Sequence, residues 1–327
     1  MELMDRSHPF IEVSIEGKTV HDAFYQRLIS ATIRDEPGQS ADTLELVFDD
    51  TGNEIEIPQK GAKIEIRFGF KGVGTWKMGT FVFERASYNF GSDGERLTFS
   101  CKSAELRADV KEPLSEHFDG ATIGQIVEQL AKRHGYKAKV SPELANTKLD
   151  YIARSNQSAA DFLTRLADRT GALFSIKDNT FLFLKRGSLP PITITKGDCS
   201  EGEFSVEPRP KYGKAAAGWY DRRRNKTIYE EHTTGLEGPT RRLRTVYASQ
   251  AEAKKAAEAE GARLARATGQ GSLTMAGTPE VMADAPINAL GFRKEFDGEW
   301  RAASVEHRFE DTYTTSIELE APEKGKE

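Results

Sequence analysis

The pair Gly17-Lys18 is the first place in the chain where the residue types could bind a phosphate group. A phosphate-binding P-loop carries another glycine five residues before its Gly-Lys pair, because the loop backbone must approach the phosphates closely. Glu12 occupies that position here. Residues 69–74 are also rich in glycine, but they join two strand-like segments and precede no helix that could hold a pyrophosphate. Both segments are predicted to be turns.

The histidines and cysteines give little support for a metal or acid–base site. No two of the six histidines have the His-x-x-x-His spacing, and the chain has no Cys-x-x-Cys pair, so zinc is not indicated. Glu116 and His117 are adjacent, and adjacent side chains point apart on a helix or a strand. Cys101 and Cys199 occupy apolar positions and are predicted to be buried, reduced thiols.

The acidic residues between positions 121 and 185 are the candidates for hydrolysis of a glycosidic bond. Two carboxylates would have to face each other across a cleft, and these residues are scattered without a motif. They are Glu128, Glu143, Asp150, Asp161, Asp168 and Asp178. We therefore predict no catalytic residue, no cofactor and no metal ligand.

One cluster of positive charge stands out between positions 221 and 244. It could form a docking surface for an acidic partner or for nucleic acid, or it could belong to two solvated hairpin turns, and both interpretations stay open. The candidate docking residues are Arg222, Arg223, Arg224, Lys226, Arg241, Arg242 and Arg244.

The composition predicts folded domains with large polar surfaces. The chain has 327 residues, of which 38% are hydrophobic and 30% charged, and its 18 Phe and 9 Tyr argue against disorder. A net charge of -5 gives no reason to expect nucleic-acid binding. The N-terminus does not resemble a signal peptide, and no apolar run approaches the ~20 residues of a membrane span.

Residues 1–105 are dense in strand patterning. Apolar and polar side chains alternate in several short runs, for example Ile64, Ile66 and Phe68 against Glu65 and Arg67. Clusters of glycine, asparagine and aspartate separate these runs. We expect a small antiparallel barrel or sandwich, since closing the sheet would remove its exposed edges.

Residues 106–189 contain one unit twice. Residues 125–140 and 161–176 both read as a helix, a glycine stop and a strand. Thr122 with Gln125, and Ser158 with Asp161, have the spacing of helix N-caps. Two copies are too few for a repeat array, so we expect a compact α/β insert, followed by a linker with paired prolines.

Strand patterning returns in residues 190–321 and is interrupted by one alanine-rich helix. That helix begins at Ser249, with Glu252 in capping-box spacing, and it has few large apolar residues. We expect a second barrel with this helix on an outer surface, and a frayed tail over residues 322–327.

Four segments give the chain a resemblance to the late control D family, the baseplate hubs of contractile phage tails. They are residues 78–106, 122–140, 157–184 and 299–320. The chain also resembles the hubs of R-type bacteriocin tails and the N-terminal region of type VI secretion spike proteins. The resemblance implies a mainly β fold with an α/β insert, in which two tail-tube-like antiparallel β-barrels are separated by a small helix–strand domain.

The resemblance also implies a non-enzymatic, structural role. The expected protein is a homotrimer that joins the hexameric tail tube, or a tube-initiator protein, to the trimeric central spike. A small LysM-like tail protein and the tape measure are further partners that it suggests. The protein would be made in the bacterial cytoplasm and assembled in the tail baseplate. Type VI spikes continue into a valine-glycine needle, and the absence of such repeats here favours a phage or bacteriocin tail.

Two other classes of function are weighed against the hub. In the first, the insert binds cell wall or degrades peptidoglycan, since some tail hubs carry such activities. In the second, the chain controls transcription, as the family's name suggests. No helix-turn-helix with a basic recognition helix is present, because a strand and a long connection separate the two similar helices, so sequence-specific nucleic-acid binding is not expected.

Overall fold

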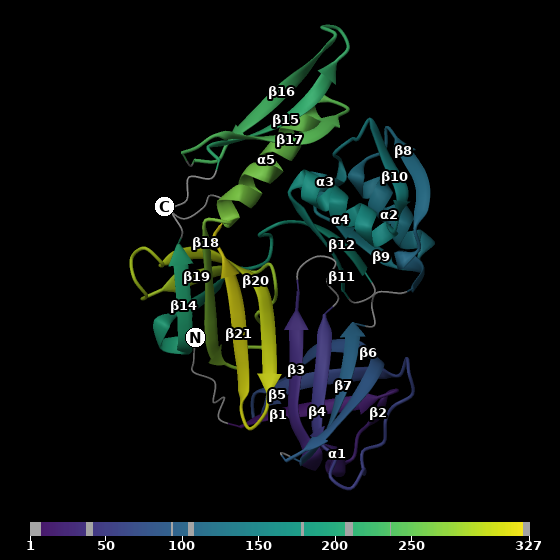
Figure 1. Cartoon of the computed structure of the whole chain (residues 1–327), viewed down its shortest axis with the longest axis vertical. Helices are drawn as coiled ribbons and strands as arrows, with labels where there is room; N and C mark the ends of the chain where they lie inside the picture. Colours follow the sequence, from purple (N-terminus) through teal and green to yellow (C-terminus); the bar gives the residue numbers. More distant parts are fainter. Residues whose placement is uncertain are drawn as a thin grey trace.

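The structure is a computed structural model that describes residues 8–36, 42–92, 94–103, 108–177, 180–206, 212–235 and 237–322. These residues are mainly β, which confirms the predicted fold class at that level. Figure 1 shows a large sheet below, with a compact α/β unit and a small helix-backed sheet above it. In these residues no helix has the length and apolar character that a membrane span requires.

The first half of the large sheet follows the alternation seen in the sequence. In β4, Leu44, Leu46 and Phe48 are buried, whereas Glu45 between them is exposed. The apolar faces of these strands meet in one core. The elements are β1 (Pro9–Ile15), β2 (Lys18–Thr19), α1 (Asp22–Arg27), β3 (Leu28–Asp35), β4 (Thr43–Asp49), β5 (Lys63–Phe70), β6 (Gly74–Gly91) and β7 (Gly94–Ser103).

The second half of the large sheet has a core of its own. Trp300 is buried there, with Ile287 and Ile317 in the same cluster. The elements are β13 (Ile192–Thr195), a 3-10 helix (Lys196–Asp198), β14 (Cys199–Val206), β18 (Gly269–Ala276), β19 (Pro286–Leu290), β20 (Gly298–Phe309) and β21 (Tyr313–Glu320).

Pairing of β20 with β3 makes the two halves one sheet. The two strands run antiparallel, from Val305 opposite Asp35 to Phe309 opposite Ala31. The strand order is β14-β18-β21-β20-β3-β4-β7-β6-β5-β1-β2, with β19 also paired to β20 and β13 paired to β19 (Figure 1). Among the described strands these pairings close no barrel, so the two expected barrels are not confirmed.

The α/β insert contains the doubled unit that its sequence predicts. Thr122 and Gln125 form a capping box at the start of α2, and the Ser158 side chain accepts a hydrogen bond from the Asp161 N–H at the start of α4. Gly171 ends α4 with a φ of 65°, in the left-handed region that favours glycine. The elements are a 3-10 helix (Ala108–Lys111), β8 (Leu114–Asp119), α2 (Ile123–Arg133), β9 (Lys137–Val140), α3 (Pro142–Ala145), β10 (Tyr151–Gln157), α4 (Ala159–Thr170), β11 (Ala172–Lys177) and β12 (Thr180–Lys185).

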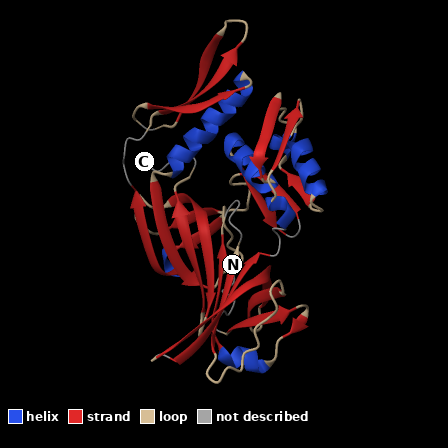
Figure 2. Ribbon diagram, turned by 45° about the vertical axis from the view of Figure 1, so that its right-hand side comes forward, coloured by secondary structure: helices blue, strands red, loops and turns tan. Residues whose placement is uncertain are grey.

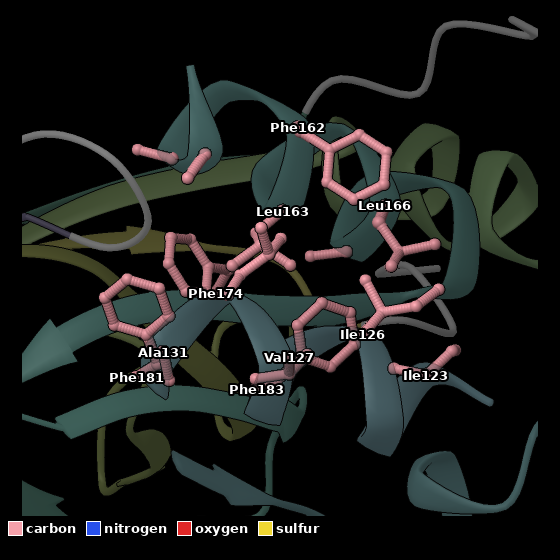
Figure 3. Close-up of a cluster of buried hydrophobic side chains, with 14 of the residues drawn as sticks. Ile123, Ile126, Val127, Ala131, Phe162, Leu163, Leu166, Phe174, Phe181 and Phe183 are labelled. Atoms are coloured by element: carbon pink, nitrogen blue, oxygen red, sulfur yellow. The ribbon is translucent and has the colours of Figure 1, made fainter. Parts of the chain in front are cut away.

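The two copies of this unit share a single hydrophobic core. Figure 3 shows apolar side chains of α2, among them Ile126 and Val127, facing those of α4, among them Leu163 and Leu166. Their strands lie in one sheet, in which β12 pairs antiparallel with β11 and parallel with β9. The doubled unit is therefore two halves of one small domain core.

Three further strands and one helix form what we call the appendage. They are β15 (Lys214–Asp221), β16 (Lys226–Thr233), β17 (Thr240–Tyr247) and α5 (Gln250–Arg266). Alanines of α5, including Ala253 and Ala256, pack against Ala217 of β15. The strand patterning of residues 190–321 predicts that these strands belong to the second barrel. The structure gives them a separate sheet in the order β16-β15-β17, because strand alternation does not specify which sheet a strand joins.

Truncating Leu166 tests the shared core of the insert. Leu166 is completely buried between the two copies, so Leu166→Ala should lower the free energy of unfolding by about 2–5 kcal/mol. Glu128→Ala, at an exposed position of α2, should change it by less than about 0.5 kcal/mol. Urea unfolding followed by circular dichroism measures both. Equal effects of the two substitutions would contradict this description.

Candidate assembly interfaces

Histidine, cysteine and carboxylate side chains form no metal-binding group in the described part of the chain. No group of three or more of them there is arranged to hold a metal ion. The insert carboxylates Glu128, Glu143, Asp150, Asp161 and Asp168 are exposed, and Asp178 lies outside the described residues. Both cysteines are free thiols. Cys101 is buried as predicted, whereas Cys199 is only half-buried.

An ion cluster fastens the insert to the large sheet. Lys177, at the end of β11, donates to Asp35 of β3 at 2.9 Å and also to Asp42. The Ala283 N–H, from the second half, donates to the other oxygen of Asp35 at 2.9 Å. Insert, first half and second half therefore meet at this one carboxylate.

The charges in this cluster are unequal, since two carboxylates share one ammonium group. Burial raises the pKa of Asp35, but Lys177 and the hydrogen bonds outweigh it, so that pKa lies below its ordinary value. Burial raises the pKa of Asp42 to about 6, and the neighbouring charge of Asp35 adds to the increase. Burial alone would lower the pKa of Lys177, and the two carboxylates raise it instead.

His307 is a buried histidine of β20, in the segment of that strand that pairs with β3. Its Nε2 donates to the Val281 carbonyl at 3.2 Å, and its Nδ1 lies 2.9 Å from the Tyr313 hydroxyl. Burial lowers the pKa of His307 to about 4, so the side chain is neutral at pH 7. It is a core histidine that packs where the two halves of the sheet meet.

The end of β6 has a free edge and carries exposed aromatic side chains. β5 pairs with β6 only as far as Val82, and beyond residue 85 no described strand except β7 pairs with it. Phe90 is 78% exposed and Tyr88 is 43% exposed, with their ring centroids 5.9 Å apart. An unpaired strand edge with exposed aromatics is a surface that soluble proteins normally cover.

β14, the first strand in the order of the large sheet, also has a free edge. β14 pairs with β18 on one side, and no other described strand pairs with its outer edge. The large sheet therefore presents an unpaired edge at the end of β6 and another at β14, besides the outer edges of β13 and of β1–β2.

Two hairpins of the large sheet have the same register. One is β6–β7, which carries the free edge at the end of β6, and the other is β20–β21, which pairs with β3. β6–β7 has a bulge between Phe83 and Arg85, and β20–β21 has one between Ala302 and Ser304. Aligning the two bulges makes residues 86–90 of β6 equivalent to residues 305–309 of β20. The segment of β20 that pairs with β3 thus corresponds to the segment of β6 that has no partner.

The first strands of the two halves correspond in the same way. β3 has an irregularity between Leu28 and Ser30, and β14 has one between Cys199 and Glu201. Aligning these makes Ala31 equivalent to Gly202. The units β14-β18-β21-β20 and β3-β4-β7-β6 therefore share strand order and bulge positions.

The seven predicted docking residues divide into two groups. One lies at the β15–β16 turn and comprises Arg222, Arg223, Arg224 and Lys226. The other lies on β17 and comprises Arg241, Arg242 and Arg244. Arg241 is opposite Ala215, six residues before Asp221, so about 20 Å of strand separates the groups.

Sequence reasoning missed Lys177 and the two free edges. Lys177 appears in the sequence as an ordinary polar strand end, and only the fold brings Asp35 and Asp42 to it. Tyr88 and Phe90 lie within the strand patterning of residues 1–105, but alternation alone does not show that one edge of their strand has no partner. The paired aromatics beyond a strand bulge are the signal that could have indicated an interface.

Comparison with known proteins identifies the family. The family model described as phage tail baseplate hub (GPD) matches residues 104–313. A protein of Escherichia phage 186 named "Probable baseplate hub protein" is 30% identical, over 95% of this chain and 92% of the relative. The protein of the same name from Escherichia phage P2 is 28% identical, over 95% and 93%. The chain belongs to the phage tail baseplate hub family, which confirms the resemblance found in its sequence.

Solved structures support the fold over the whole chain. The 43 kDa tail protein of prophage MuSo2 from Shewanella oneidensis matches with a TM-score of 0.73 at 16% identity. The match covers 98% of this chain and all of the Shewanella protein. The arrangement of large sheet, insert and appendage is thus shared with a protein of very different sequence.

Removing Lys177 should weaken the attachment of the insert. Lys177→Met leaves two buried carboxylates without their cation, and the lysine side chain is 37% exposed, so we expect a modest cost of about 1–3 kcal/mol. Hydrogen exchange should quicken in β3 and β11, whereas α2 should keep its protection. Lys185→Met, at an exposed position of β12, is the control. Unchanged exchange in β3 would show that the cluster does not hold the insert.

Because its pKa is lowered, His307 should make stability depend on pH. It contributes stability above its unfolded pKa of 6.5 that is lost as pH falls toward its folded pKa of about 4. The full loss corresponds to about 3 kcal/mol, since one pKa unit equals about 1.4 kcal/mol. His307→Gln should lack this part of the pH dependence. Parallel slopes for the two proteins between pH 7 and 4 would contradict the assignment.

Proposed function

We propose that the chain is the structural adaptor of a contractile tail, a homotrimer that joins the hexameric tail tube to the trimeric central spike. The observation that carries this proposal is the repeated register. Within one chain, the end of β20 in the second half pairs with β3 in the first half. The end of β6 is equivalent to the end of β20, and β14 is equivalent to β3. The end of β6 in one copy can therefore pair with β14 of the next copy.

The in-chain junction supplies the register for this contact between copies. Transferring the β20–β3 pairs to the equivalent residues places residues 86–90 of one copy opposite residues 202–206 of the next. Ser87 then lies opposite Ser205, and Tyr88 lies opposite Phe204. Edge pairing of this kind satisfies backbone groups that the isolated chain leaves to water.

The same junction indicates how the exposed aromatics become covered. Phe309, the equivalent of Phe90, packs into the core of the other half at 5.9 Å from Phe68, measured between ring centroids. Tyr313 packs beside it, 5.0 Å from the same ring. Burying Phe90 in the neighbouring copy would remove a large apolar surface from water.

Three copies joined in this way would present six similar units around a ring. Each chain contributes two, which suits a hexameric tube on one face and keeps three-fold symmetry for a spike on the other. The two tube-like units of the proposal belong to residues 1–105 and 190–321, the second without the appendage, with the insert of residues 106–189 outside the ring and residues 322–327 as a tail. The chain would be made in the bacterial cytoplasm and function in the baseplate.

We also propose that the role is non-enzymatic. The described insert carboxylates are exposed and are spread over α2, α3, the turn before β10, and α4, which argues against a glycosidase of the two-carboxylate type. A peptidoglycan zymogram of the purified chain tests this point, because lysis at the level of a lysozyme would overturn it.

A double cysteine variant tests the ring contact. Ser87→Cys with Ser205→Cys, in a Cys199→Ser background, should form disulfides between copies under mild oxidation. Directly paired strand positions have the Cα separation that a disulfide requires. Non-reducing electrophoresis should show linked species up to three times 36.3 kDa.

Two controls make that result specific. Each single cysteine variant should form no ladder of linked copies, and Ser87→Cys with Ser272→Cys, one strand further away, should link poorly. A monomer that never cross-links, or equal linking in all pairs, would count against the proposed ring.

A further inference from the structure

The appendage extends away from the large sheet that would form the ring. Figures 1 and 2 both show its small sheet at the far end of the molecule, with α5 leading to it. One face of that sheet packs on α5, where Trp219 and Leu243 lie against the helix alanines. The other face and the β15–β16 turn point outward, and the ring contacts proposed above use neither.

The β15–β16 turn is built to hold its basic residues in place. One Asp221 oxygen accepts hydrogen bonds from the backbone N–H groups of Arg223 at 2.8 Å and Arg224 at 3.2 Å. The Tyr220 hydroxyl donates to the Asn225 side chain across the turn, and Asn225 has a φ of 49°. This turn is pre-organised, so fewer conformations are lost when a partner binds.

The positive charges at this turn are mostly uncompensated. Arg224 lies 3.6 Å from Asp221. Arg222, Arg223 and Lys226 are exposed and have no carboxylate partner among the described residues. The chain as a whole carries a net charge of -5, so this basic turn is a local reversal of its charge.

The outward face of the sheet adds side chains that are common at protein interfaces. The Arg242 guanidinium lies over the Tyr229 ring, 5.2 Å from its centroid. Tyr229 itself lies next to Gly218, where a Cβ would meet the ring at 3.2 Å. Tyr220 and Val246 are exposed nearby on the same sheet. Tyrosine and arginine are enriched where proteins bind one another.

We propose that the β15–β16 turn and the outward face of the appendage dock an acidic surface of another protein of the tail. The partner is identified by its chemistry: carboxylates that meet Arg222, Arg223 and Lys226, beside an apolar patch that meets Tyr229 and Val246. Arg241 is outside this surface, since it pairs with Glu260 of α5 at 3.5 Å. The inference rests on the proposed hub role and adds a contact distant from tube and spike.

A protein partner is favoured over nucleic acid and over a second copy. The basic turn and the three arginines of β17 lie at opposite ends of the sheet, and the carboxylates of Glu231 and Asp221 lie on the same hairpin as the turn. This spacing suits separate carboxylates better than a continuous phosphate backbone. A second copy is already accommodated by the two free edges of the large sheet.

Site-specific cross-linking in assembled tails tests the proposal. A photoreactive phenylalanine analogue replaces Lys226 in the full chain, and the same analogue at Lys294, in an exposed turn of the other half, is the control. We expect the first position to link to an acidic segment of another tail protein and the control not to. Links to nucleic acid or to a second copy, or no links at all, overturn the proposal.

Charge reversal gives the matched second measurement. Arg222→Glu with Arg223→Glu should reduce that cross-link by roughly tenfold, whereas Arg293→Glu with Lys294→Glu, an equal change of net charge, should not. Arg222→Gln with Arg223→Gln repeats the test with a smaller perturbation. Retention of the cross-link in the neutral and reversed variants overturns the proposal. The native mass of the wild-type chain and of each variant is measured in parallel. If the wild type forms no species of three chains, the proposed ring is refuted, whereas the cross-linking result for the appendage still stands.

Discussion

The antiparallel pairing of β20 with β3 is the contact on which the rest of the structure depends. It joins strands that are about 270 positions apart in the chain and turns two similar four-stranded units into one sheet. Without it each unit would have a second exposed edge, and the hairpin end that carries Phe309 and Tyr313 would lie in water. His307 is buried at this place, and Asp35, which receives Lys177, stands at its end.

The ionic attachments of the insert follow from that junction. Lys177 binds carboxylates of the first half, Arg186 lies 3.6 Å from Asp284 of the second half, and Arg169 pairs with Glu252 of α5. The insert has its own apolar core, and these ion pairs attach it to the other parts beside contacts such as the Lys255–Thr147 hydrogen bond and the Arg169 guanidinium over the Tyr247 ring. Such contacts fix orientation while leaving the insert a separately folded unit.

Local features of the fold could be predicted from the sequence, and long-range ones could not. Helices α2 and α4 were predictable because Thr122, Ser158 and Gly171 mark their ends within a few residues of the apolar stripe. The alternating strands were predictable for the same local reason. Strand partners were not, because β15, β16 and β17 alternate just as β20 and β21 do, and nothing local assigns them to a separate sheet. The candidate interface at the end of β6 could not be predicted either, because it too depends on strand partners. The free edge at Phe90 exists only because β5 stops pairing at Val82.

The central claim is that identical chains close a ring through the same register that joins the two halves of one chain. The most direct test is the native mass of the full chain, measured alone and after mixing with the central spike protein of its tail. We expect a species of three chains, formed by the chain itself or stabilised by the spike. A chain that stays monomeric under both conditions would contradict it.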